Sequence, residues 1–235
     1  ELYGSNSAYI QSYIYGRFTA LCEGNCYTNY SPIKHAVEDQ APDPYRDIYL
    51  SLDFNASPLA WVSGQLVPYE EYGTRKHRML IQHNADLGGT VLEDAAVEFA
   101  AKHPPARFGN TLIKLYGDSS GHAESHKTRE TDYDAMRRYL TDLGYRRVEV
   151  CALRYNPLET VSVEAANRWF LGDGCYHCRC CVNLQRSLMG TRWRDGEKKI
   201  EKKPGEKITH WSDALKYLAF ALQEGAGRNV ISVNA

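Results

Sequence analysis

Three short apolar runs in close succession limit most strongly what this chain can fold into. They cover residues 48–54, 59–66 and 78–82, and they follow one another at hairpin spacing. We therefore expect three consecutive strands that form an antiparallel meander. The first run ends at an acid, Asp53, which places a carboxylate near the end of a strand.

Helical and extended patterns alternate along the rest of the chain. Apolar residues recur at helical spacing within 90–102, acids occupy the first turn of this segment, and two prolines end it. Strands are expected at 111–116 and 147–151, and further helices at 133–143, 161–171 and 209–222. A meander followed by this alternation predicts an α/β fold. With 235 residues, 43% of them hydrophobic, the chain can bury a core of that size.

The ends of the chain and its charge add expectations about its origin. Residues 1–40 carry aromatic and small polar residues in irregular order, so we expect a connector there and one domain over 41–235. The first residue is Glu1 rather than Met, which suggests a piece of a longer protein. The sequence shows neither a long apolar run nor a signal-peptide pattern, so we expect a soluble intracellular protein that is not secreted. A net charge of -1 means that any DNA contact must come from local patches.

Three acids occupy the places where an α/β sheet presents ligands. Asp53 lies near the end of the first strand, Asp118 directly follows a later strand, and Asp213 lies in the first turn of the last helix. Together they would form a carboxylate cluster of the kind that holds Mg²⁺. Taken singly, each has a structural explanation as a turn cap, an Asx-turn or a partner of the helix dipole.

Basic residues gather shortly before the last helix. A hairpin rich in lysine at this place would bind phosphates without sequence preference. Because Glu197, Glu201 and Glu206 interleave with the lysines, an ordinary solvated loop explains the pattern equally well. The candidate DNA contacts are Lys198, Lys199, Lys202, Lys203, Arg192 and Arg194.

Histidines follow or precede two of the acids. His122 and His126 come just after Asp118, and His210 precedes Asp213 by three residues. A histidine suits proton transfer near a scissile phosphate. The alternative is that His210 satisfies the start of the helix and the other two face solvent in a loop.

Four of the seven cysteines fall together as Cys175, Cys178, Cys180 and Cys181. The first two have C-x-x-C spacing with His177 between them, which is one half of a structural zinc site. A second, separated ligand pair is missing from the sequence. The alternative is a half-buried strand over 176–182 in which reduced cysteines act as small apolar residues.

Several segments, in their order along the chain, resemble a known family. They are Leu50-Ser-Leu-Asp53 with the turn that follows, Tyr116-Gly-Asp118-Ser-Ser-Gly121 followed by Thr131-Asp132-Tyr133, and His210-x-x-Asp213-Ala214-x-x-Tyr217. Asn156-Pro157 with Val163-Glu-Ala-Ala-Asn167, and a lead-in segment at 13–18, complete the pattern. These segments resemble the large subunits of tailed-phage terminases. In that family the C-terminal domain has an RNase H-like (RuvC/integrase-like) fold, with a mixed central sheet flanked by helices.

The resemblance implies a function and a set of partners. Asp53, Asp118 and Asp213 would be catalytic acids that bind Mg²⁺ or Mn²⁺, with two ions expected. The activity would be endonucleolytic cutting of concatemeric double-stranded DNA during headful packaging, with little sequence specificity, in the host cell cytoplasm. Partners would be an ATPase motor domain joined through residues 1–40, a portal protein and a small terminase subunit, with no membrane involved. The cysteine-rich stretch departs from the family pattern.

Other functions are also compatible with these residues. The chain has no G-x-x-x-x-G-K-[ST] loop, so ATP hydrolysis is not expected of it. A free-standing RNase H-like nuclease, such as a junction resolvase or a transposase core, is one alternative. A packaging domain that docks without catalysis is another. Metal-dependent nicking of plasmid DNA would separate the enzymes from the docking domain.

Overall fold

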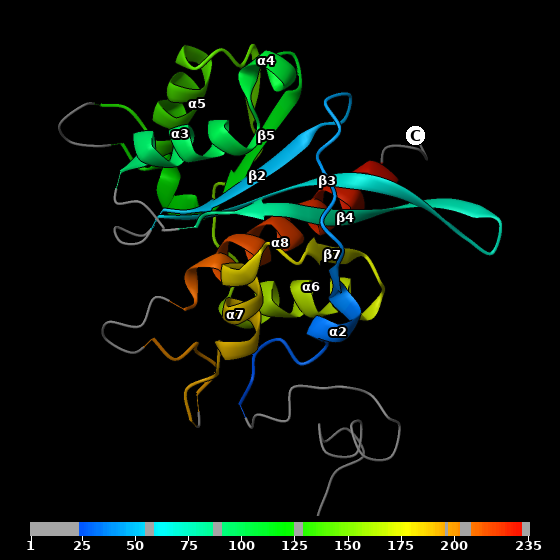
Figure 1. The fold of residues 1–235 in the computed structure, drawn as a ribbon. Helices are drawn as coiled ribbons and strands as arrows, with labels where there is room; N and C mark the ends of the chain where they lie inside the picture. The colour runs from blue at the N-terminus through cyan, green and yellow to red at the C-terminus, as the bar shows by residue number, and fades with distance from the viewer. Residues whose placement is uncertain are drawn as a thin grey trace, which may run out of the picture.

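The computed structural model of the chain describes residues 24–54, 59–86, 91–124, 129–195, 197–202 and 208–231, with side chains in the last segment up to residue 224. Its strands form one mixed sheet in the order β1-β7-β4-β3-β2-β5-β6 (Figure 1). They are β1 (Ala36–Val37), β2 (Ile48–Asp53), β3 (Ala60–Glu71), β4 (Thr74–Asn84), β5 (Leu112–Gly117), β6 (Arg147–Val150) and β7 (Cys175–Cys178).

The expected meander lies at the centre of this sheet. β2 pairs antiparallel with β3, and β3 pairs antiparallel with β4. β5 and β6 add in parallel beside β2, while β7 and β1 add in parallel beside β4. The α/β fold and the antiparallel meander predicted from the sequence are thereby confirmed, as are the strands expected near 111–116 and 147–151.

The hairpin between β3 and β4 is longer than the sequence predicted. Its strands continue to Glu71 and from Thr74, so that a two-residue turn joins them. Both turn residues have positive φ, 49° at Tyr72 and 74° at Gly73, as two-residue hairpin turns of this hand require. The far part of the hairpin extends beyond the rest of the sheet as an arm (Figure 1). The sequence did not predict this outer part of the two strands, because both of its faces are exposed and its residues show no alternation of apolar and polar side chains.

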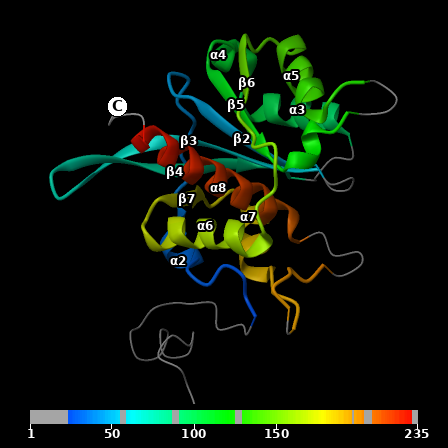
Figure 2. The ribbon, with the colours of Figure 1, turned by 180° about the vertical axis from the view of Figure 1, so that it is seen from behind.

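Helices cover the sheet around β2, all of whose residues are buried. The helices are α2 (Pro32–His35), α3 (Leu92–Lys102), α4 (Pro105–Phe108), α5 (Asp132–Asp142), α6 (Glu159–Leu171), α7 (Val182–Gly190) and α8 (His210–Ile231), with a 3-10 turn η1 (Ser119–His122). α3 packs on β3 through Phe99 and Trp61, whose ring centroids lie 5.9 Å apart. On the other face, α8 contacts β2, β3 and β5, and α6 and α7 pack against it (Figure 2).

Alternation along β2 decides which side chains face α8. The Ser51 hydroxyl donates to the backbone oxygen of Ala214 in α8 over 2.7 Å. Leu52 pairs with Trp61 and so faces α3. Because side chains alternate along a strand, Asp53 shares the face of Ser51 and points toward α8.

The cysteine-rich segment over 176–182 differs from the strand predicted for it. The strand predicted over 176–182 is wrong in its second half, because β7 ends at Cys178 and α7 begins at Val182. The amide of Cys181 donates a hydrogen bond to the backbone oxygen of Cys178 in a tight turn, and buried cysteines fit such a turn as easily as a strand.

Within the predicted lead-in, Tyr27 and Tyr30 are buried in the core and β1 joins the sheet edge. Residues 1–23 lie outside the described part. No helix in the described segments is both long and apolar enough to span a membrane.

Candidate metal centre

Asp53 and Asp118 stand at the ends of two neighbouring parallel strands. Leu52, the next-to-last residue of β2, pairs with Gly117, the last residue of β5. The residue that follows each of them is an acid, so both acids lie at the carboxyl ends of these strands. Both carboxylates are buried. Gly117 permits this approach, because its φ is 150° and a Cβ there would lie 2.3 Å from the oxygen of Leu52.

The first turn of α8 completes the site. His210 Nδ1 lies 2.7 Å from Oδ2 of Asp53, and the bond from Ser51 to Ala214 holds this turn against β2. Potential ligand atoms of Asp53, His210 and Asp213 all lie within 4.8 Å of one another. Among the described residues, no other group of three or more histidine, cysteine or acidic side chains has its ligand atoms this close together. Asp118 does not belong to this group. The structure therefore brings Asp53 and Asp213 together and adds His210, which the sequence interpretation did not count as a ligand.

Asp118 makes its own local contacts. Its Oδ1 accepts a hydrogen bond of 2.8 Å from the amide of Ser120, as the Asx-turn interpretation expected. Its backbone oxygen accepts one of 2.9 Å from the Tyr133 hydroxyl. Burial, and then the charge of Asp118, raise the pKa of the Asp132 carboxyl. Asp118 therefore caps a turn and also contributes negative charge to this edge of the sheet.

Tyr217 shows that all three acids act on one region. Burial raises the pKa of its phenol, and the negative charges of Asp213, Asp118 and Asp53 raise it further, in that order. The charge of Asp118 therefore acts on the same buried phenol as the charges of the other two acids.

Two lysines contact Asp213 in different settings. Lys216 Nζ lies 2.6 Å from Oδ1, and both side chains of this pair are 2% exposed. Lys202 Nζ lies 3.5 Å from Oδ2, and its side chain is 51% exposed. Burial acts to lower the pKa of Lys202, but the charges of Asp213, Asp53 and Glu159 together with the hydrogen bond to Asp213 raise it. Lys216 was not among the site residues predicted from the sequence, although its position three residues after Asp213 in a helix is typical of an ion pair.

The other predicted site residues lie apart from the carboxylates or outside the described segments. Arg192, Arg194, Lys198 and Lys199 are exposed on the segment that precedes Lys202. A bridge between Trp193 and Ile200 closes this segment into a hairpin. His122 approaches the oxygen of Ala152 at 3.4 Å, not a carboxylate. Lys203 and His126 fall outside the described residues.

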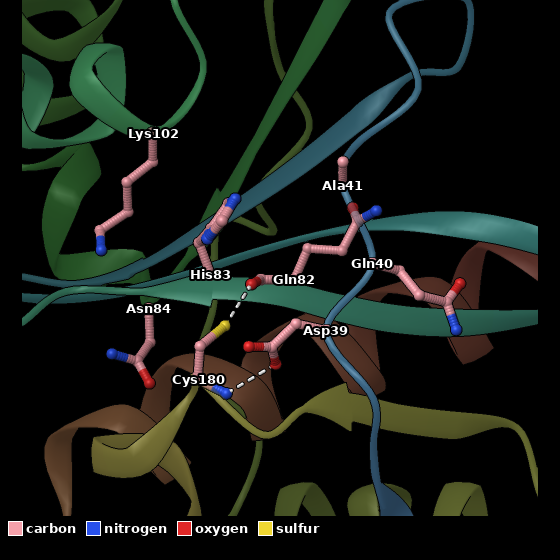
Figure 3. A pocket seen from close by; sticks show the side chains of 8 residues that line it. All are labelled: Asp39, Gln40, Ala41, Gln82, His83, Asn84, Lys102 and Cys180. Atoms are coloured by element: carbon pink, nitrogen blue, oxygen red, sulfur yellow. Dashed lines mark hydrogen bonds between the residues drawn. The ribbon is translucent and has the colours of Figure 1, made fainter.

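The cysteine-rich stretch forms part of the core and one wall of a pocket. Cys175, Cys178 and Cys181 are buried and Cys180 is exposed. Figure 3 shows the Cys180 thiol directed at the backbone oxygen of Gln82, 3.3 Å away, and its amide bonded to the Asp39 carboxylate. The cavity beside it measures about 380 Å³.

The geometry of β7 does not favour the zinc interpretation. Cys175 and Cys178 lie three residues apart in a strand, so their side chains point to opposite faces of the sheet. Both ring nitrogens of His177 are engaged, by the Tyr30 hydroxyl at 2.7 Å and the Cys178 oxygen at 2.9 Å. These residues are better explained as packing and hydrogen-bonding groups.

Comparisons with known proteins show the fold. No protein-family model matches the sequence, and no curated protein matches it either. The large terminase of a thermophilic bacteriophage, solved with ATP-gamma-S, matches 84% of this chain with a TM-score of 0.55 and 16% identity. This chain spans 45% of that protein's length. The nuclease domain of the P22 large terminase matches 85% of this chain with a TM-score of 0.55 and 12% identity, and 91% of that domain is covered. The RNase H-like fold implied by the sequence resemblance is thereby confirmed.

Proposed function

We propose that this chain is the nuclease domain of a viral terminase large subunit, a metal-dependent endonuclease that cuts double-stranded DNA with little sequence specificity during genome packaging. The observation that carries this proposal is the arrangement of acids beside β2, where Asp213 of α8 gathers with Asp53 and His210, and Asp118 follows the neighbouring parallel strand β5. The P22 domain of the same fold is a large terminase nuclease domain. Residues 1–40 would then connect to an ATPase motor domain, and the thermophilic-phage terminase, of which this chain spans 45%, is long enough to hold one.

The donor set fits a hard divalent cation. Carboxylate oxygens are the ligands that Mg²⁺ and Mn²⁺ prefer, and an imidazole is also compatible with Mn²⁺. Three buried carboxylates in one region repel one another unless cations offset their charge. Asp53, Asp118 and Asp213 would hold the metal, with two ions as the full complement. Divalent ions held by these residues would supply the chemistry of phosphodiester hydrolysis, which is activation of a water and stabilisation of the leaving oxygen.

The protein groups around the acids hold them in place for this chemistry. His210 contacts Oδ2 of Asp53, the Ser120 amide contacts Oδ1 of Asp118, and Lys216 contacts Oδ1 of Asp213. Each carboxylate is therefore oriented by a donor from its own surroundings, so little reorganisation is needed when ligand binds.

DNA would reach this site past the exposed hairpin that carries Arg192, Arg194, Lys198 and Lys199. Contacts from these side chains to phosphates would be independent of sequence. During packaging in the host cytoplasm, the further partners would be the portal protein and the small terminase subunit.

Nicking of supercoiled plasmid by the purified chain tests the proposal. We expect cleavage with Mg²⁺ or Mn²⁺, none in EDTA, and none above background for Asp53→Asn or Asp118→Asn. Cutting by either variant at the wild-type rate would overturn the site assignment. A folded wild-type chain that binds no Mn²⁺ and cuts no DNA would favour a docking domain instead.

A further inference from the structure

Lys216 is a charged side chain inside the protein. It lies on α8 between residues that pack in the core, and the whole residue is 1% exposed. Its ammonium donates to Oδ1 of Asp213 over 2.6 Å. An ammonium so far from water is stable only when it is paired, and removal of its partner is costly. The pair is therefore a permanent part of the core and not a surface contact.

The pair limits what Asp213 can offer to a metal ion. Lys216 occupies Oδ1 of Asp213, and Lys202 approaches Oδ2. The Asp213 side chain also lies close to the possible ligand atoms of Asp53 and His210. A carboxylate that bridges two ions uses one oxygen for each. We propose that Lys216 is a positioning residue that restricts Asp213 to one oxygen and one ion, and that balances its charge whenever that ion is absent. This inference rests on the proposed metal-dependent function.

Lys202 provides the contrast. Its side chain is 51% exposed and its ammonium is 3.5 Å from Oδ2, so solvent screens the pair and a metal can displace it. Lys216 cannot leave in this way, because its helix and its buried surroundings hold it. The two lysines on one carboxylate therefore have different roles, one permanent and one exchangeable.

The charge of Lys216 should weaken the binding of a metal ion to Asp213. A fixed positive charge next to Asp213 repels a divalent ion, so the wild-type chain binds Mn²⁺ more weakly than a chain without Lys216. In Lys216→Met, Asp213 is buried without its partner, and the metal-free melting temperature should fall by about 10 °C. Mn²⁺ then supplies the missing charge, so it should raise the melting temperature of the variant more than that of the wild type. Mn²⁺ affinity should rise about tenfold, while the cutting rate at saturating Mn²⁺ falls about tenfold because Asp213 is no longer held in one orientation.

The experiment measures melting temperature with and without Mn²⁺, Mn²⁺ affinity by calorimetry, and plasmid nicking. Lys202→Met is the matched control, for which we expect tighter Mn²⁺ binding but a metal-free melting temperature within about 2 °C of the wild type. An equal loss of stability in Lys216→Met with and without Mn²⁺, together with unchanged affinity, would show a purely structural lysine and overturn the inference.

A double variant covers the case in which Lys216→Met does not fold. Asp213→Asn/Lys216→Met removes both charges, and we expect it to fold with a melting temperature closer to the wild type than that of Lys216→Met. Failure of the double variant to fold would show that Lys216 supports the core through other contacts, which contradicts the proposal. If the wild-type chain itself binds no Mn²⁺, the proposed function fails. Mn²⁺ binding to the wild type with no change in Lys216→Met would overturn only the inference about Lys216.

Discussion

Two aspartates near the C-terminal part of the chain differ in their surroundings. Asp213 is buried and gathers with Asp53 and His210, whereas Asp195 is exposed in a turn. Asp213→Asn keeps an oxygen that can accept a hydrogen bond from Lys216, but it leaves the buried ammonium without a counter-charge, so the variant should melt at a lower temperature than the wild type and is assayed below that temperature. It also removes the charge that binds a cation. We expect Mn²⁺ affinity and nicking rate each to fall by about 100-fold. Asp195→Asn should change neither quantity.

Calorimetry with Mn²⁺ and a plasmid assay on the same preparations check this prediction. Wild-type Mn²⁺ affinity together with wild-type cutting in Asp213→Asn would remove this acid from the site. A similar loss in Asp195→Asn would indicate that charge in general, not the buried cluster, controls the activity.

The cysteines also differ from one another in a testable way. A hydrogen bond with the Cys181 thiol lowers the pKa of Cys180, which is exposed. Burial raises the pKa of Cys178 to about 11. Because the thiolate is the reactive form, iodoacetamide at pH 8 should modify Cys180 well before Cys178. Peptide mass spectrometry over time would show the order, and earlier modification of Cys178 would contradict this account of the stretch.

At the scale of elements, the approach of β2 and β5 decides whether two acids meet. In Gly117→Ala the new Cβ would lie 2.3 Å from the Leu52 oxygen and 2.8 Å from the Tyr133 hydroxyl, at a φ of 150°. We expect a loss of about 3 kcal/mol in unfolding free energy, from strain and from the forced separation of the strands. Nicking should fall as well, since Asp118 would move relative to Asp53.

Gly73→Ala is the matched control for backbone strain. Gly73 has a φ of 74°, but a Cβ there meets nothing within 4 Å. This variant should lose only about 1 kcal/mol and keep its activity. Chemical denaturation of both variants checks the difference, and equal losses would mean that the strand contact at Gly117 contributes little.

Apolar periodicity predicted most elements but not their lengths or mutual contacts. The strand to Asp53 and the helix that carries Asp213 were predictable, because buried strands and helices repeat apolar residues at periods of two and 3.6. The outer part of the β3–β4 hairpin was not, since its exposed residues follow no such pattern. The contact of His210 with Asp53 joins residues 157 positions apart, and no local pattern in one sequence encodes it.

At the scale of the whole molecule, the candidate site and the hairpin arm lie at opposite ends of the sheet. β3 begins beside Asp53, with which Ala60 pairs, and runs for 12 residues to the turn. At about 3.3 Å per residue, the turn is roughly 35 Å from the acids. The basic residues before Lys202 lie on the chain segment that reaches the site, whereas those of the arm are distant from it. Position, and not total charge, should therefore decide which of them affect DNA binding.

Charge reversal at the two places separates these contributions. Lys198→Glu/Lys199→Glu should lower DNA affinity and reduce the slope of log affinity against log salt by about 2, since about 0.9 is lost for each phosphate contact. Arg75→Glu/Lys76→Glu changes the net charge equally at the exposed tip of the arm and should leave the slope unchanged. Fluorescence anisotropy with a short duplex at several salt concentrations gives the slope. Mn²⁺ affinity should be the same in both variants, because both pairs of side chains are exposed and screened by solvent. If the arm variant lost as much of the slope as the hairpin variant, DNA would be held by the overall charge of the protein, and the path to the site past Lys198 and Lys199 would be wrong.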